Sequence, residues 1–202
     1  MDILNKLKKS WTLLITMSLL IQSPVEAKAN PKNTIEKAGS QIISILKNKS
    51  LKKTVKKERI SKIFYETFSR QRMAQAALRS NYKKLTDPQK KEFSKLFARF
   101  ILEFYLDKMD LYNDNKLIIR EAVEKRKGKI ALVKTGITLP NGNIAEIDYS
   151  LYNEPSVGWQ VYDFEIEGVR MSTTYYSQLA SIYKKGKYKG LKKELNRLIN
   201  LY

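Results

Sequence analysis

Apolar residues recur at helical spacing along the first part of the chain. The spacing i, i+3, i+4 begins after Pro31 and predicts a helix with one apolar face. The lysine-rich stretch 47–59 keeps apolar residues at the same spacing and predicts an amphipathic second helix. The pattern continues from Ile60 into a short third helix around residues 70–78. The apolar positions of the first helix are Ile35, Ala38, Ile42, Ile43 and Leu46.

The next helix has the clearest start signal. Thr86 can cap it, Gln89 can complete a capping box, and Pro88 falls in the first turn, where its missing amide is not needed. The apolar stripe that follows predicts a helix of about 20 residues, about 30 Å long. Its members are mainly aromatic: Phe93, Leu96, Phe97, Phe100, Ile101, Phe104 and Tyr105.

From Lys116 the apolar period changes to two, which is typical of strands. Asn141 and Gly142 form a strong hairpin signal, because both residues accept a positive φ at low cost. After Gly168 the helical period returns, first over residues 172–183 and then over 188–201. The predicted fold is therefore α+β, with a twisted antiparallel sheet of about four strands wrapped by N- and C-terminal helices. The predicted strands are residues 117–123, 129–139, 144–152 and 159–167.

The N-terminus has the pattern of a secretory signal peptide. Three lysines precede an apolar run over residues 11–21, and the small residues Ala27 and Ala29 provide two cleavage sites. The run of 11 residues is too short for a membrane span, which needs roughly 20. We therefore expect residues 1–29 to be removed on export to the periplasm, leaving one domain over residues 30–202.

The chain contains no cysteine and no histidine. Ser-His and Cys-His nucleophilic sites and His/Cys zinc sites are therefore excluded, and the eight glycines form no nucleotide-binding motif. Asp163, Glu165 and Glu167 alternate on one predicted strand, where paired carboxylates would allow acid–base catalysis. Ion pairing with the many basic residues explains them more simply. We expect no catalytic residue, metal or cofactor, and keep a small enzyme using Asp163 or Tyr175 as a third possibility.

The formal charge is +19, and removal of residues 1–29 deletes four lysines and two acids, leaving +17. Such a charge favours polyanions, and an exported protein meets anionic lipid headgroups rather than nucleic acid. We therefore expect no nucleic-acid partner. The lysines between 184 and 189 suit anionic phospholipid or an acidic docking surface, although a solvated charge cluster at a helix end explains them more simply. An exported basic adaptor or polyanion-binding protein without a lipid cavity is the alternative function.

Residues 158–182 run from an aromatic strand through a glycine corner into a helix. The segments Trp159–Asp163, Glu167–Val169 and Met171–Thr174 resemble the MlaC-like family, also called toluene-tolerance auxiliary proteins, and the likeness extends over residues 68–195. Where the family has serine before the last helix, this chain has Arg170. Ser172 or Thr173 is then expected to cap that helix, unless Arg170 lies at a pocket mouth near a phosphate.

The resemblance implies a non-catalytic periplasmic carrier that moves phospholipids between outer and inner membranes and maintains outer-membrane lipid asymmetry. It also implies a deep apolar pocket, a phospholipid as cargo, and two docking partners, an inner-membrane ABC lipid-transport complex and an outer-membrane lipoprotein–porin complex. We expect a monomer, and for Asp163 a structural hydrogen-bonding role. Ordinary core packing is the alternative for each candidate lipid-binding residue. Those candidates are Phe97, Phe100, Ile101, Phe104, Tyr105, Trp159, Val161, Val169, Met171 and Tyr175.

Overall fold

The computed structural model describes residues 30–108, 116–139 and 141–202, so the predicted signal peptide lies outside the described residues. Helices occupy both ends of this part of the chain, and a sheet lies between them in the sequence. This arrangement confirms the predicted α+β fold. The helices are α1 (Pro31–Lys47), α2 (Lys53–Thr67), α3 (Arg70–Leu78), a 3₁₀ segment η1 (Arg79–Lys84), α4 (Asp87–Asp107) and α5 (Met171–Ile199).

The sheet is an antiparallel meander in which every strand pairs with its sequence neighbour. Four long strands correspond to those predicted, and a fifth, of two residues, is added at the edge. The extra strand forms because Gly168, at φ +77°, turns the chain back onto β4. The strands are β1 (Leu117–Lys125), β2 (Ile130–Thr138), β3 (Ile144–Glu154), β4 (Gly158–Ile166) and β5 (Val169–Arg170).

The start of α2 differs from the prediction of a helix over residues 47–59. The chain leaves the helical conformation at Asn48 and re-enters it at Lys53. Asn48 explains the break, because its side chain accepts hydrogen bonds from the backbone N–H (3.0 Å) and hydroxyl (2.6 Å) of Ser50. Such local bonds compete with helix continuation.

The start of α4 follows its sequence signal closely. Thr86 and Gln89 form the predicted capping box of α4: the Gln89 N–H donates to the Thr86 hydroxyl and the Thr86 N–H donates to Gln89 Oε1. The two predicted C-terminal helices are both present. They join into α5 across a kink at Lys187, where φ is 50° and ψ is −148°.

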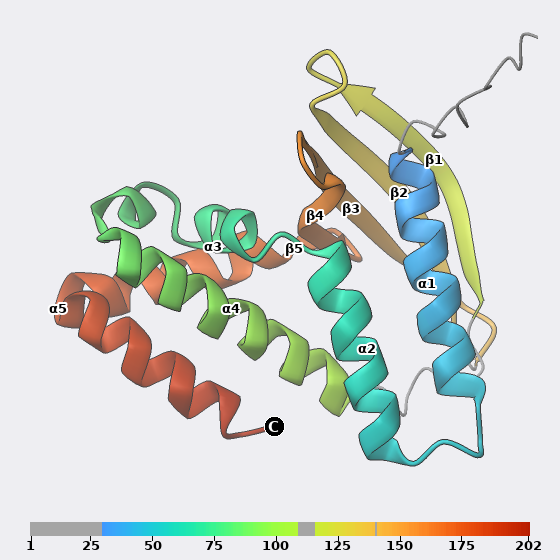
Figure 1. The fold of residues 1–202 in the computed structure, drawn as a ribbon, viewed down its shortest axis with the longest axis horizontal. Helices are drawn as coiled ribbons and strands as arrows, with labels where there is room; N and C mark the ends of the chain where they lie inside the picture. The colour runs from blue at the N-terminus through green and yellow to red at the C-terminus, as the bar shows by residue number, and fades with distance from the viewer. Residues whose placement is uncertain (1–29, 109–115, 140) are drawn as a thin grey trace, which may run out of the picture.

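The helices are arranged in two groups around the sheet (Figure 1). α1 lies along the sheet with α2 beside it, while α3, α4 and α5 pack together on the other side of α2. The largest core cluster fills the space among these three helices and includes the fully buried Phe93, Phe97, Leu191 and Leu195. A second cluster, with Leu151 and Trp159 among its members, lies against one end of the sheet. None of the helices in the described part of the chain combines the length and apolarity that a bilayer span requires.

Candidate functional site: an apolar cavity between helices and sheet

A cavity of about 390 Å³ lies between the sheet and the helices α1, α2 and α4. Its volume is within the range of about 300–1,000 Å³ found for small-molecule sites. No charged side chain of the described residues lines it, and the side-chain polar atoms in the lining are the hydroxyls of Thr67, Tyr105 and Tyr149. The lining residues are Ile35, Ala38, Gly39, Ile42, Ile43, Leu46, Ile60, Ile63, Phe64, Thr67, Phe68, Ile101, Leu102, Tyr105, Leu106, Leu117, Ile137, Leu139, Ala145, Ile147, Tyr149, Phe164 and Ile166.

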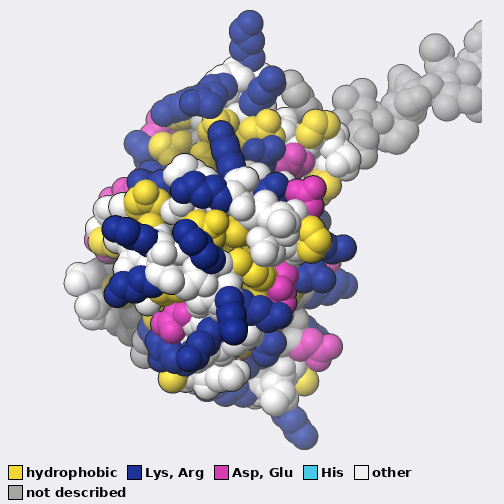
Figure 2. All heavy atoms as spheres, turned by 90° about the vertical axis from the view of Figure 1, so that its left-hand side faces the viewer, with side chains coloured by type: hydrophobic (Ala, Val, Ile, Leu, Met, Phe, Trp, Pro, Cys, Tyr) yellow, Lys and Arg dark blue, Asp and Glu magenta, His cyan; other side chains and the backbone are white. Residues whose placement is uncertain are grey.

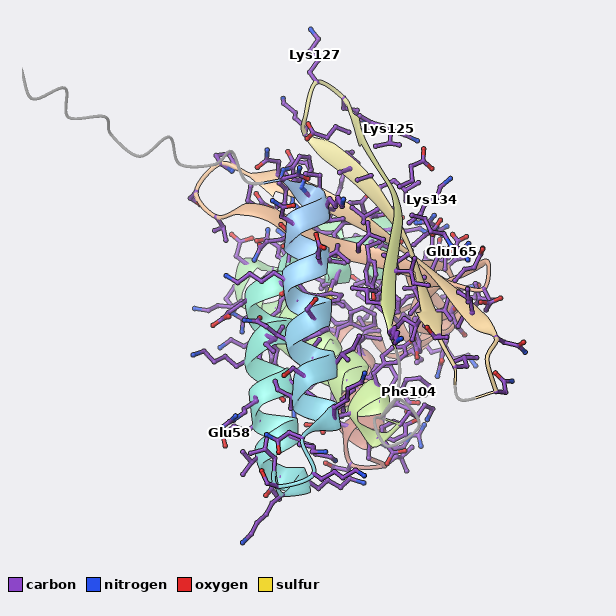
Figure 3. All side chains as sticks on the ribbon, turned by 90° about the vertical axis from the view of Figure 1, so that its right-hand side faces the viewer. Glu58, Phe104, Lys125, Lys127, Lys134 and Glu165 are labelled. Atoms are coloured by element: carbon purple, nitrogen blue, oxygen red, sulfur yellow. The ribbon has the colours of Figure 1, made fainter. Side chains whose placement is uncertain are left out.

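The outer wall of the cavity is formed by α1 and α2, which lie side by side next to the sheet (Figure 3). The apolar face of α1 supplies six lining residues in three turns, from Ile35 to Leu46. Gly39 brings the helix close to the sheet, because a Cβ atom at this position would overlap the side chain of Leu117 at the start of β1. The apolar residues that predicted this helix from the sequence therefore also form part of the cavity wall.

The inner wall consists of side chains from all four long strands, with alternate residues of β3 and β4 facing the cavity. A bulge in β4 changes which residues face inward: Val161 pairs with Leu151, but the next partner pair is Asp163 with Ser150, so Tyr162 is the extra residue. Val161 and Phe164 consequently both face the helices. The same bulge turns Asp163 toward the N-terminus of α5.

The inward-facing residues of β2 and β3 are fully buried at one end of the sheet and partly buried at the other, which shows which end of the cavity is closed. On β3, Leu151 is fully buried, whereas Tyr149, Ile147 and Ala145, which face the cavity, are partly buried. On β2, Val133 is fully buried and Ile137 is partly buried. The cavity is therefore closed at the level of Tyr149 and reaches the surface toward the β2–β3 connection.

Two of the predicted lipid-binding residues line the cavity, Ile101 and Tyr105 of α4. The others lie outside the lining. Phe97 and Phe100 face α5, with the Phe100 and Tyr175 rings 5.2 Å apart and the Phe97 and Tyr175 rings 6.0 Å apart, and the ring of Phe104 lies 5.4 Å from that of Tyr202, beyond the end of α5.

The remaining candidates are on β4 or beyond it. Trp159 and Val161 are buried in the second core cluster, and Met171 is buried in the first. Val169 is 62% exposed on β5. Ten of the lining residues that sequence reasoning missed come from α1 and α2, whose apolar faces gave a signal for helices but none for a cavity.

Asp163 caps α5 in place of the two residues expected to do so. It is 2% exposed, and it accepts hydrogen bonds from the backbone N–H (3.1 Å) and the hydroxyl (2.6 Å) of Ser172, and from the backbone N–H of Phe164 (3.0 Å). Ser172 lies inside the first turn and donates its hydroxyl, so neither it nor Thr173 caps the helix. The hydrogen bonds agree with the structural role expected for Asp163.

Arg170 is held by carboxylates of β4. Its Nη2 lies 2.8 Å from Glu165 Oε2 and its Nη1 lies 3.4 Å from Asp163 Oδ2. The side chain is not part of the cavity lining. Its charge is therefore used within the fold and does not mark the cavity mouth.

The electrostatics of the cavity are those of an apolar site. Burial raises the pKa of the Tyr149 hydroxyl to about 12, so it stays neutral at physiological pH. Among residues 30–108, 116–139 and 141–202, no group of three acidic side chains lies close enough to hold a metal ion.

A family model described as MlaC protein matches residues 36–197. The chain belongs to the MlaC family. Its fold is similar to that of a phospholipid-binding protein from Ralstonia solanacearum solved in complex with a phospholipid, with a TM-score of 0.76 and 19% sequence identity. This match covers 86% of the present chain and 98% of the Ralstonia chain, so the two share the MlaC fold over nearly the whole domain. A search of curated proteins finds no match.

Proposed function

We propose that this MlaC-family protein binds a phospholipid by its acyl tails in the cavity and carries it through the periplasm between the outer and inner membranes. The observation that carries the proposal is the cavity itself, which combines apolar walls from three helices and four strands with a lining free of charged side chains among the described residues. Acyl chains need this environment and no directed polar groups.

The energetics explain why such a carrier is required. A diacyl lipid has on the order of 30 methylenes, so at about 0.8 kcal/mol each its tails cost roughly 25 kcal/mol to expose to water. A carrier has to recover most of this free energy in its cavity, but not much more, since the lipid must also be released. No bond is made or broken, and no residue in the cavity is assigned a catalytic role.

The comparisons support this proposal at the level of family and fold. The Ralstonia protein was solved with a phospholipid, and this chain shares its fold and belongs to the MlaC family. The membership also favours the predicted export of residues 30–202 after removal of residues 1–29, and a monomeric carrier that docks on an inner-membrane ABC complex and an outer-membrane lipoprotein–porin complex.

The surface charge fits a protein that approaches anionic membranes. Figure 2 shows many lysine and arginine side chains and few acids on the face formed by α3, α5 and the adjoining part of α4. Lys184, Lys185, Lys187 and Lys189 are exposed on α5. In our proposal these charges increase the encounter rate with lipid surfaces, and the cavity holds the cargo.

A vesicle-to-vesicle transfer assay tests the carrier function. Donor vesicles containing a self-quenched fluorescent phospholipid are mixed with unlabelled acceptor vesicles, with and without the mature protein. We expect the protein to accelerate dequenching in proportion to its concentration. The acyl tails stay enclosed in the cavity while the protein diffuses from one vesicle to another, so they are not exposed to water. Salt-sensitive vesicle binding without transfer would contradict the proposal and favour the basic adaptor.

A further inference from the structure

Two hydroxyl groups lie at the closed end of the otherwise apolar cavity. Thr67, the last residue of α2, is 9% exposed, and Tyr149 is partly buried at the centre of β3. Both line the cavity, and neither hydroxyl has a hydrogen-bond partner within the part of the chain that the structure describes. Buried hydroxyl groups normally have such partners, so these two call for an explanation.

Tyr149 marks the boundary between the cavity and solid core. Its ring packs against both core clusters, and the next inward-facing residue of β3, Leu151, is fully buried beside its partners Ala131 and Val161. Toward the open end, Ile147 and Ala145 line the cavity. A chain that enters from the open end therefore meets Tyr149 before it meets the packed core.

We propose that Tyr149, together with Thr67, forms a polar floor that limits how deeply an acyl chain enters the cavity and thereby selects cargo by chain length. This inference rests on the proposed phospholipid-binding function. While the floor is uncovered, water can solvate both hydroxyls. A chain long enough to cover them removes that water and leaves them without partners.

Chains that are too short and chains that are too long lose affinity by different amounts. A chain shorter than the cavity loses about fourfold in affinity for each missing methylene, the equivalent of about 0.8 kcal/mol. A chain that covers an unpartnered hydroxyl loses about tenfold for that hydroxyl. Affinity should therefore rise gradually with chain length up to the floor and then stop rising or fall.

The experiment measures which chain lengths the protein extracts from a mixture. Vesicles containing equal amounts of phosphatidylglycerols with a graded series of saturated chains are incubated with the mature protein, and the bound lipid is quantified by mass spectrometry. Tyr149→Phe and Thr67→Val each remove one hydroxyl with little change of shape. Tyr149→Ala also deepens the cavity. Tyr82→Phe is the matched control, because the Tyr82 hydroxyl is buried 3.2 Å from Ser94 Oγ and lies outside the cavity lining.

We expect Tyr149→Phe and Thr67→Val to increase the ratio of the longest to the optimal chains by about tenfold each. Tyr149→Ala should move the optimum to longer chains still, and Tyr82→Phe should leave the profile unchanged. Identical profiles for all four variants and the parent, at full lipid occupancy, would overturn the floor but not the lipid carrier. Failure of the parent protein to extract any lipid would overturn both.

Discussion

Replacing Ile147 with glutamate should reduce phospholipid binding by about a hundredfold, because a carboxylate among acyl chains costs about 3 kcal/mol. Ile147 lies in the first half of β3, faces the cavity and is only partly buried. In the empty protein the new carboxylate can be solvated inside the cavity, so the fold should survive. When tails fill the cavity, that solvation is lost.

The measurement for this variant is lipid uptake from vesicles, with circular dichroism as the check on folding. Val169→Glu is the matched control, since it makes a similar aliphatic-to-glutamate change at a residue that is 62% exposed and outside the lining. We expect Val169→Glu to bind lipid normally. Undiminished uptake by a folded Ile147→Glu protein would show that the tails bind elsewhere.

Replacing Asp163 with alanine should lower the free energy of unfolding by about 3 kcal/mol, which combines loss of a helix cap with a buried, unpaired amide. The carboxylate is 2% exposed and joins β4 to the first turn of α5 through Ser172. Its removal also takes away one of the two carboxylates that contact Arg170. The effect should concern stability, since Asp163 does not line the cavity.

Urea unfolding of the purified variant measures this change. Glu165→Ala removes the neighbouring partner of Arg170, a side chain that is 27% exposed, and should cost at most about 1 kcal/mol, as surface ion pairs do. Equal effects of the two substitutions would contradict the capping role of Asp163. Lipid uptake by folded Asp163→Ala should remain near that of the parent.

Much of the fold could be predicted because local signals agree with tertiary structure. The Thr86 capping box gave the start of α4, and the change of apolar period near Lys116 gave the start of the sheet. The break between the last two helices was also predicted. The structure places it at Lys187 beside Gly186, a residue that lowers the cost of interrupting a helix.

The candidate site was harder to predict, because an apolar helix face looks the same in sequence whether it meets core or cavity. Ile101 and Phe100 are neighbours on α4, yet Ile101 lines the cavity and Phe100 packs against Tyr175 on α5. The deciding factor is the position of α1 and α2. The distance between these helices and the sheet depends on contacts such as that of Gly39 with Leu117.

Native mass spectrometry of the purified mature chain tests the central claim most directly. We expect a major species heavier than the polypeptide by the mass of one phospholipid, which is lost on delipidation and regained on incubation with vesicles. A folded protein that carries no lipid and acquires none from vesicles would contradict it.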